Sequence, residues 1–181
     1  MHRRPFISPI LVDLVYQAVS GVSGVHFTQA VPCPVCSGMP VSHDIKKRRF
    51  STVYVPNGEK HIYVFVKRFH CRDCGHLCYA KAPFYDKSRF GSPIVDLCIS
   101  LSQNHTFSHA ATIMNRMGIV INRGTVRKTA QTYTHHVDAT DIFGLWLPDS
   151  ILALSTLVTT TDSHFPLKGE DILSACKLFL E

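Results

Sequence analysis

The sequence predicts an α+β fold in which a small four-cysteine β-hairpin precedes a bundle of three short helices, with a helical N-terminus and a partly helical tail. Three observations predict it: two Cys-x-x-Cys pairs enclose two strand-like runs, three segments with helical periodicity follow, and the charge changes sign near residue 140. We expect four parts in the 181 residues: an N-terminal helix and linker at 1–31, the four-cysteine unit at 32–83, the helical bundle at 90–140, and an acidic, apolar tail at 141–181.

The N-terminal helix is predicted to begin at Ser8-Pro9, because serine suits the cap and proline the first helical position. Gly21 is expected to end it, and residues 22–31 to form a linker. We expect this helix to pack on the hairpin or on a partner subunit through one apolar face, formed by Leu11, Leu14, Val15, Ala18 and Val19.

The cysteine pairs are Cys33-Pro34-Val35-Cys36 and Cys71-Arg72-Asp73-Cys74. Each pair can turn two thiolates toward one metal, and four thiolates suit a tetrahedral structural zinc ion. Two disulfides would instead require an oxidising compartment, and a thioredoxin-like site would have one such pair in a βαβ context. We therefore predict that Cys33, Cys36, Cys71 and Cys74 bind Zn²⁺ and that the metal supplies most of the folding free energy of this small unit.

Other cysteines and histidines near this site are expected to have different roles. Cys78, Cys98 and Cys176 are interpreted as small buried hydrophobic residues. His70 and His76 flank the second pair and could replace a ligand, although we favour a solvent-facing or phosphate-facing role for both.

Between the cysteine pairs, residues 50–55 and 61–66 are predicted to be the strands of a hairpin. Pro56-Asn57-Gly58 is the predicted turn, with Asn57 and Gly58 supplying the two positive φ angles of a tight connection. Gly75 is expected to let the chain turn away from the second pair, and residues 76–80 to add a third strand. Together, these features predict a zinc ribbon.

The charge of the chain is uneven. Residues 1–140 carry 17 Lys and Arg against 7 Asp and Glu, a net of +10, whereas residues 141–181 carry 2 against 6, a net of −4. A basic body indicates a polyanionic partner, and nucleic acid is the first candidate. No apolar run is long enough to span a membrane, so we expect a soluble, cytoplasmic protein without a membrane partner.

Six of these charges are expected to gather where the two hairpin strands approach the metal. Phe50, Tyr54 and Phe69 are interleaved with them, which favours contact with a nucleic-acid backbone. The alternative is a solvated basic edge that only prevents strand pairing. The six residues are Lys46, Lys47, Arg48, Arg49, Lys67 and Arg68.

Three helices are predicted after the ribbon. The first begins at Ser92-Pro93, Thr106 caps the second, Gly118 ends the second, and Asn122 caps the third. The buried stripe of the third helix is predicted to be Val126, Ala130, Tyr133 and Val137. Its opposite face is polar and basic, as in the recognition helix of a helix-turn-helix, although a generic bundle with a charged surface would look similar. The predicted DNA-contacting residues of this helix are Asn122, Arg123, Thr125, Arg127, Lys128 and Gln131.

Four features follow one another along the chain: the Cys-Pro-x-Cys pair, the basic hairpin, the segment Lys67-Arg68-Phe69-His70-Cys71-Arg72-Asp73-Cys74-Gly75, and the helix-turn-helix pattern. This order resembles the N-terminal half of prokaryotic insertion-sequence (DDE-type) transposases. The resemblance covers roughly residues 30–137. It implies that the four cysteines are zinc ligands, that Asn122–Gln131 begins a recognition helix, and that the partner is double-stranded DNA at the terminal inverted repeats of an element, in the nucleoid.

Transposases of this kind continue into a ribonuclease-H-like domain whose three acidic residues hold two metal ions. Here 42 residues follow Ala139, and their carboxylates form no recognisable triad, so we expect no activity from this chain alone. One alternative is that residues 157–161 form a first catalytic strand ending at Asp162. The apolar runs 151–158 and 172–180 are expected to pack on the bundle or to mediate self-association.

The leading interpretation is thus the end-recognition part of a truncated or split transposase, whose catalytic half lies on another chain if the enzyme is intact. Two alternatives remain open at this point. One is a transcriptional regulator with the same fold and the same electrostatics, and the other is a ribbon used for protein–protein contacts.

Overall fold

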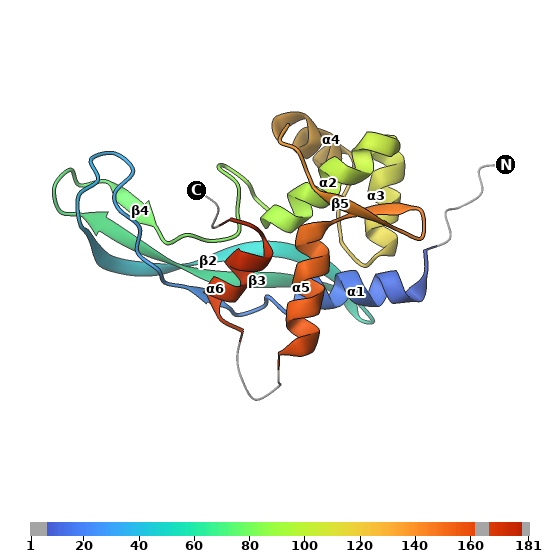
Figure 1. The fold of residues 1–181 in the computed structure, drawn as a ribbon, viewed down its shortest axis with the longest axis horizontal. Coiled ribbons are helices and arrows are strands. Elements are labelled where there is room, and N and C mark those ends of the chain that lie inside the picture. The colour runs from blue at the N-terminus through green and yellow to red at the C-terminus, as the bar shows by residue number, and fades with distance from the viewer. Residues whose placement is uncertain (1–6, 162–166, 179–181) are drawn as a thin grey trace.

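The computed structural model describes residues 7–161 and 167–178 and has a mixed α+β fold (Figure 1). A long hairpin forms an arm, and the helices gather around one end of it while β4 lies at the other. The helices are α1 (Pro9–Ser20), α2 (Ser92–Asn104), α3 (Phe107–Arg116), α4 (Arg123–Thr132), α5 (Asp149–Thr160) and α6 (Gly169–Ala175). The strands are β1 (His26–Phe27), β2 (Pro40–Val55), β3 (Gly58–Cys71), β4 (Leu77–Tyr79), β5 (Ala139–Ile142) and β6 (Leu145–Pro148).

The predicted hairpin is present and is longer than expected, since β2 and β3 continue to the second cysteine pair. The predicted turn geometry is wrong in one respect, because Gly58 has a positive φ (131°) whereas Asn57 does not. Proline fixes its own φ near −65° and favours the first central position of a turn, so Pro56 and Asn57 become the two connecting residues. Gly58 then pairs with Val55 as the first residue of β3.

Two short strands complete the sheet. The predicted third strand is confirmed as β4, which pairs antiparallel with β3, and β1 pairs with β3 in parallel orientation. β1 lies within residues 22–31, for which we had predicted a linker without a strand. Because β1 and β4 both pair with β3, the far edge of β2 has no partner strand among the described residues.

The core is one continuous hydrophobic cluster that receives side chains from all four predicted parts. Phe50, Val53 and Ile62 of the hairpin are fully buried in it. These residues lie in the half of the hairpin near the turn, beside the helices, so this half is held by the core. Members of the same cluster elsewhere include Leu11 of α1, Leu97 of α2, Met114 of α3, Leu154 of α5 and Ile172 of α6.

The predicted starts of α2, α3 and α4 are confirmed. Thr106 Oγ1 accepts a hydrogen bond from the His109 N–H, and Asn122 Oδ1 accepts one from the Thr125 N–H at 2.8 Å. The predicted extent of α4 is wrong, because the helix ends at Thr132. Four residues of low helix propensity follow, Tyr133-Thr134-His135-His136, and the Tyr133 hydroxyl donates to the Asp86 carbonyl.

Consequently the predicted buried stripe of α4 is only partly correct. Val126 is buried, but Thr129 takes the buried position that we had assigned to Ala130, which is half-buried. Val137 is buried outside the helix, in a second small cluster with Val95 and Ile99.

The turn between α3 and α4 is bonded to the free edge of β2. The Val120 N–H donates to the Thr52 carbonyl and the Tyr54 N–H to the Gly118 carbonyl, each at 2.8 Å. Between them, Val53 and Ile119 form an isolated antiparallel bridge. This junction holds the helices against the hairpin.

Residues 139–178 wrap the same core. The alternative of a catalytic strand at 157–161 is wrong, because Leu157–Thr160 is the last turn of α5, and Asp162 lies outside the described residues. α5 packs along α1, where a Cβ at Gly21 would collide with Val158. The described parts of both apolar runs pack within the chain, since Ile151, Leu154, Ile172 and Leu173 are buried; Phe179 and Leu180 lie outside the description.

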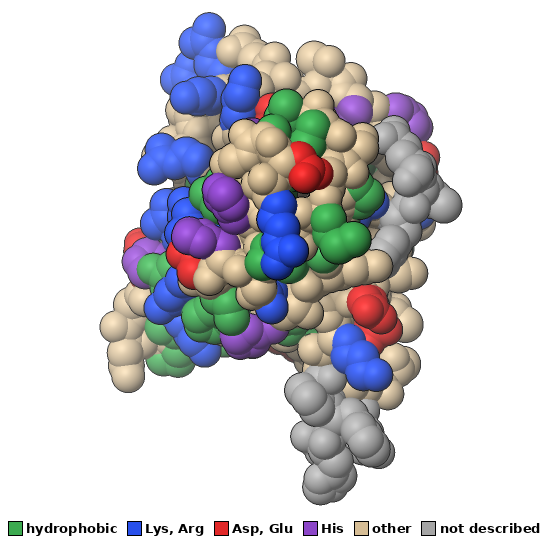
Figure 2. All heavy atoms as spheres, turned by 90° about the vertical axis from the view of Figure 1, so that its left-hand side faces the viewer, with side chains coloured by type: hydrophobic (Ala, Val, Ile, Leu, Met, Phe, Trp, Pro, Cys, Tyr) green, Lys and Arg blue, Asp and Glu red, His purple; other side chains and the backbone are tan. Residues whose placement is uncertain are grey.

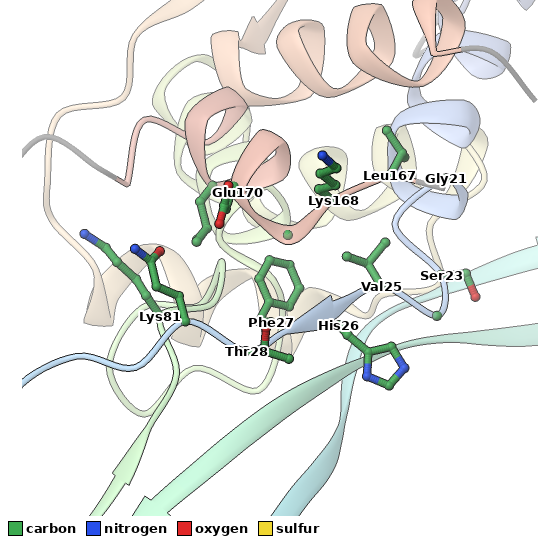
Figure 3. Close-up of a pocket in the computed structure, with 14 residues that line it drawn as sticks. Gly21, Ser23, Val25, His26, Phe27, Thr28, Lys81, Leu167, Lys168 and Glu170 are labelled. Atoms are coloured by element: carbon green, nitrogen blue, oxygen red, sulfur yellow. The ribbon is translucent and has the colours of Figure 1, made fainter. Parts of the chain in front are cut away.

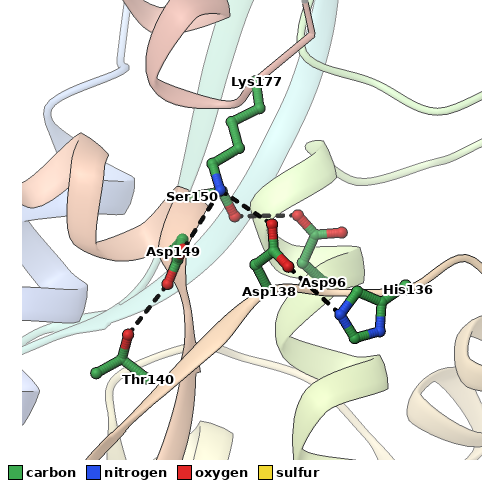
Figure 4. A network of polar contacts seen from close by, with 7 residues as sticks. All are labelled: Asp96, His136, Asp138, Thr140, Asp149, Ser150 and Lys177. Atoms are coloured by element: carbon green, nitrogen blue, oxygen red, sulfur yellow. Dashed lines mark hydrogen bonds and ion pairs between the residues drawn. The ribbon is translucent and has the colours of Figure 1, made fainter. Parts of the chain in front are cut away.

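Polar contacts connect this last segment to the helices (Figure 4). Ser150 Oγ donates to the buried Asp96 carboxylate of α2 at 3.0 Å, and Lys177 Nζ lies 3.0 Å from Asp138 and 3.3 Å from Asp149. Lys177 lowers the pKa of Asp138, chiefly through their hydrogen bond. Among the described helices, none is both long and apolar enough to cross a membrane.

Candidate metal centre and basic surface

The two cysteine pairs adopt matching backbone turns at the end of the arm. The Ser37 N–H donates to the Cys33 carbonyl at 2.8 Å, and the Gly75 N–H donates to the Cys71 carbonyl at 3.1 Å. Both donors follow the second cysteine of their pair and both have positive φ, 58° for Ser37 and 74° for Gly75. The predicted turn at Gly75 is therefore confirmed, and Ser37 is its counterpart, which sequence reasoning missed because serine rarely adopts this conformation.

These turns bring Cys33, Cys36, Cys71 and Cys74 together. Their Sγ atoms all lie within 4.8 Å of one another, with 3.6 Å from Cys33 to Cys74 and 3.4 Å from Cys36 to Cys71. Four sulfurs at 2.3 Å from a tetrahedral ion would be about 3.8 Å apart, so the donor set fits a single metal ion. Cys33 and Cys71 are buried and Cys36 and Cys74 exposed, so one side of the cluster is shielded from water.

The thiols shift the pKa values of Cys33 and Cys36 in opposite directions. Burial disfavours the Cys33 thiolate, but hydrogen bonds from the backbone of Cys36 and Val35 and from the thiols of Cys74 and Cys71 together lower its pKa to about 6. For Cys36, the Gly38 backbone favours the thiolate, yet the thiols of Cys74 and Cys71 prevail and raise the pKa to about 12. A bound cation would favour all four thiolates, which is the usual chemistry of a structural metal site.

The remaining cysteines are buried, as predicted. Cys78 Sγ lies 3.7 Å from the His76 carbonyl oxygen, and Cys98 contacts Met114, with 3.8 Å between their sulfurs. Burial raises the pKa of both Cys98 and Cys176 to about 12, so these thiols stay protonated. His70 and His76 are exposed and stand outside the metal-ligating group found in the described residues.

The six basic residues of the hairpin divide into two groups. Arg48 and Arg68 are engaged within the protein: Arg48 donates to the Ser88 carbonyl at 3.0 Å and covers the Phe84 ring, and Arg68 pairs with Asp44. Lys46 and Lys47 are exposed, and Arg49 and Lys67 are half-buried. The structure thus leaves four of the six available to a ligand.

The predicted contact residues of α4 also divide. Arg123, Arg127, Lys128 and Gln131 are exposed on the helix surface. Thr125 is half-buried, and Asn122 uses its side chain to cap the helix. Figure 2 views the molecule from the arm's end and shows Lys and Arg gathered along one side of it.

Between α4 and the hairpin lies an open groove of about 740 Å³. Arg49 of β2, Arg89 of the segment before α2 and Lys128 of α4 all line it. Sequence reasoning assigned no role to Arg89, because nothing in its local pattern indicates that it meets α4.

A second hollow of about 630 Å³ lies between residues 21–29 and α6 (Figure 3). Phe27 forms part of its wall, and its charged residues are of both signs, Lys81 and Lys168 with Glu170. The acidic residues of the tail are used locally: Asp149 accepts from Thr140, and Asp141 accepts from the Gly144 N–H. Among the described residues, the four-cysteine group is the one metal-ligating cluster.

No family model, curated protein or solved structure matches the chain.

The matching turns give opposite predictions for the two residues with positive φ. Gly75→Ala should weaken metal binding about fivefold or more, because a Cβ in the left-handed region costs about 1–2 kcal/mol. Space is not limiting there, as the nearest atom, His70 Nε2, is 4.0 Å from the added Cβ. Ser37→Gly should leave the affinity unchanged or raise it. Competition with a chelator measures both, and equal losses in the two variants would contradict the matching geometry.

Metal loss should affect only part of the hairpin. Cys71→Ser removes one ligand, so amide exchange is expected to accelerate in residues 33–45 and 66–77, whereas residues 50–62 stay protected by the core that contains Phe50 and Ile62. Cys98→Ala is the control, since it opens the core but leaves the ligands intact. Loss of protection throughout residues 50–62 in the Cys71 variant would show that the metal holds the whole hairpin.

Proposed function

We propose that the chain is a zinc-stabilised, sequence-specific DNA-binding protein. In this proposal α3, the turn at 117–122 and α4 act as a helix-turn-helix, and α4 places its first turns in the major groove. The hairpin beside it contacts the phosphate backbone, and Zn²⁺ occupies the four-cysteine site. An all-sulfur, four-ligand set favours zinc, and thiols this close together suit one ion rather than a multi-iron cluster.

The observation that carries this proposal is the arrangement of cationic groups around one junction. Arg123 and Arg127 are exposed on α4, and Lys128 faces the groove that Arg49 of the hairpin also lines. The backbone hydrogen bonds between Thr52 and Tyr54 and the turn before α4 hold the cationic side chains of the helix at a defined position beside those of the hairpin. Charges fixed on two elements can follow a duplex, where phosphate contacts position the protein and base contacts specify the sequence.

Residue types on α4 suit base recognition. Arg127 can donate two hydrogen bonds to guanine, and Gln131 can pair with adenine, in each case through atoms in the major groove. Lys128 and Thr125 suit phosphate contact. Asn122, by contrast, is proposed to support the helix through its cap rather than to contact DNA.

We further propose that this DNA is the terminal inverted repeat of a mobile element, with the chain as the end-recognition part of a transposase. The order of cysteine pair, basic hairpin, cysteine pair and three helices supports this. The strand-transfer chemistry would need carboxylates other than the described ones, because the metal-ligating group found among the described residues is made of cysteines alone.

Selection from random duplex DNA tests the proposal. The zinc-loaded protein at about 0.15 M salt, where non-specific phosphate binding is weakened, should enrich a site of about one helical turn, roughly 10 base pairs. A match between that site and inverted repeats beside the gene would support the transposase role. Retention of duplexes without any enriched sequence would contradict sequence-specific reading.

Two substitutions separate base reading from phosphate contact. Arg127→Ala should relax preference at one base pair and cost about 1–3 kcal/mol on the selected site alone. Lys47→Ala should weaken all duplexes about equally and reduce the salt dependence of log K by about one unit. Binding titrations at several salt concentrations measure both effects. The same behaviour in both variants would refute the assignment of α4 as reader and the hairpin as backbone contact.

A further inference from the structure

The hairpin has an outer face that turns away from the core. Ile62, Val64 and Val66 of β3 are fully buried, so the alternating residues Tyr63 and Phe65 lie on the opposite face. In the register of the sheet, Tyr63 pairs with Arg49 and Phe65 with Lys47. We define the outer face by these four residues together with Lys67, His61 and His26.

Tyr63 and Phe65 are aromatic residues without a packing role in the core. Both are half-buried, and neither belongs to either hydrophobic cluster. The exposed His26 stacks on Phe65 with 4.7 Å between ring centroids and 16° between planes. Lys47 Nζ lies 4.1 Å from the centre of the Tyr63 ring. The face therefore presents aromatic rings beside cationic side chains.

The spacing of the rings favours an unpaired strand over a duplex. Alternate residues of a strand are about 7 Å apart, whereas successive bases in a duplex are about 3.4 Å apart. An extended single strand can place successive bases on rings at the wider spacing, and its unstacked bases expose the surfaces that aromatic side chains bind.

The charge of the face suits a phosphate backbone. Lys47, Arg49 and Lys67 flank the rings. Within the described hairpin, the carboxylate on the outer face is that of Glu59, which lies next to the turn. Asp44 is held by Arg68 through two hydrogen bonds. At the helix end, Arg49 and His61 continue into the 740 Å³ groove that reaches Lys128 of α4.

We propose that the outer face binds single-stranded nucleic acid, as the unpaired continuation of a strand whose duplex part lies against α4. Tyr63 and Phe65, the latter with His26, stack on bases, and Lys47, Arg49 and Lys67 contact phosphates. The Lys47 side chain moves from the Tyr63 ring to a phosphate when a base arrives. The inference rests on the proposed function in taking nucleic acid as the partner; it shares Lys47 and Arg49 with the duplex-contacting surface and adds the rings of Tyr63 and Phe65, which take unpaired bases.

The test is binding of fluorescent oligothymidylate, which cannot pair with itself, to the zinc-loaded full chain at about 0.15 M salt. Tyr63→Leu combined with Phe65→Leu should lower the affinity about tenfold or more, since each stacked base contributes severalfold to binding. Affinity for duplex DNA should change by less than about twofold. No binding of oligothymidylate by the unaltered protein, or equal binding by the double variant, would overturn the proposal.

Matched variants separate ring stacking from folding and from charge. Tyr63→Phe keeps the ring and should keep the affinity for oligothymidylate, and a loss there would contradict stacking. Arg127→Ala should leave oligothymidylate binding unchanged while altering duplex preference. Duplex selection without an enriched site, together with ring-dependent oligothymidylate binding, would refute the proposed function and support the outer face; the reverse pattern would do the opposite.

Discussion

The backbone hydrogen bonds between β2 and the turn at 118–120 decide where α4 lies relative to the hairpin. Edge strands carry unpaired N–H and C=O groups, and here the turn satisfies two of them at Thr52 and Tyr54. Asn115 strengthens the same junction, because its side chain donates to the carbonyls of Ala111 and Ile121 and accepts from the Ile121 N–H and the Tyr54 hydroxyl. Together with the shared hydrophobic core, this contact joins the hairpin and the helices into one surface.

The junction also explains why the two ends of the hairpin differ. Near the turn, Phe50 and Ile62 are fully buried among helices, so burial of apolar surface holds the strands. At the other end, the strands extend away from the helices, and the four thiols of the two cysteine pairs lie close together. We had expected the metal to supply most of the folding free energy of the whole ribbon. That expectation stays a prediction, and the core itself reaches the site, because Cys33 and Cys71 belong to the same hydrophobic cluster as Phe50 and Ile62.

Much of this arrangement was predictable from local sequence. Cysteine spacing predicted which residues meet, because two tight turns on paired strands leave few other arrangements, and the caps at Thr106 and Asn122 predicted where helices begin. The end of α4 was not predictable from apolar spacing, since Tyr133 and Val137 continue the helical pattern but make tertiary contacts. The partial burial of the Arg48 side chain was also not predictable, because it results from contacts with Phe84 and Ser88, which are distant in sequence.

Contacts between distant segments also decide which charges remain for a ligand. A run of four basic residues suggests four equivalent contacts, but alternation in a strand places Lys47 and Arg49 on the outer face and Lys46 and Arg48 on the other. The linker before α2 then covers Arg48, and burial lowers its pKa by disfavouring the charged form. Aromatic residues follow the same alternation, which is why Tyr63 and Phe65 lie beside Lys47 and Arg49. The combination of rings and charge on one face thus arises from strand geometry, and it requires no motif that sequence inspection could recognise.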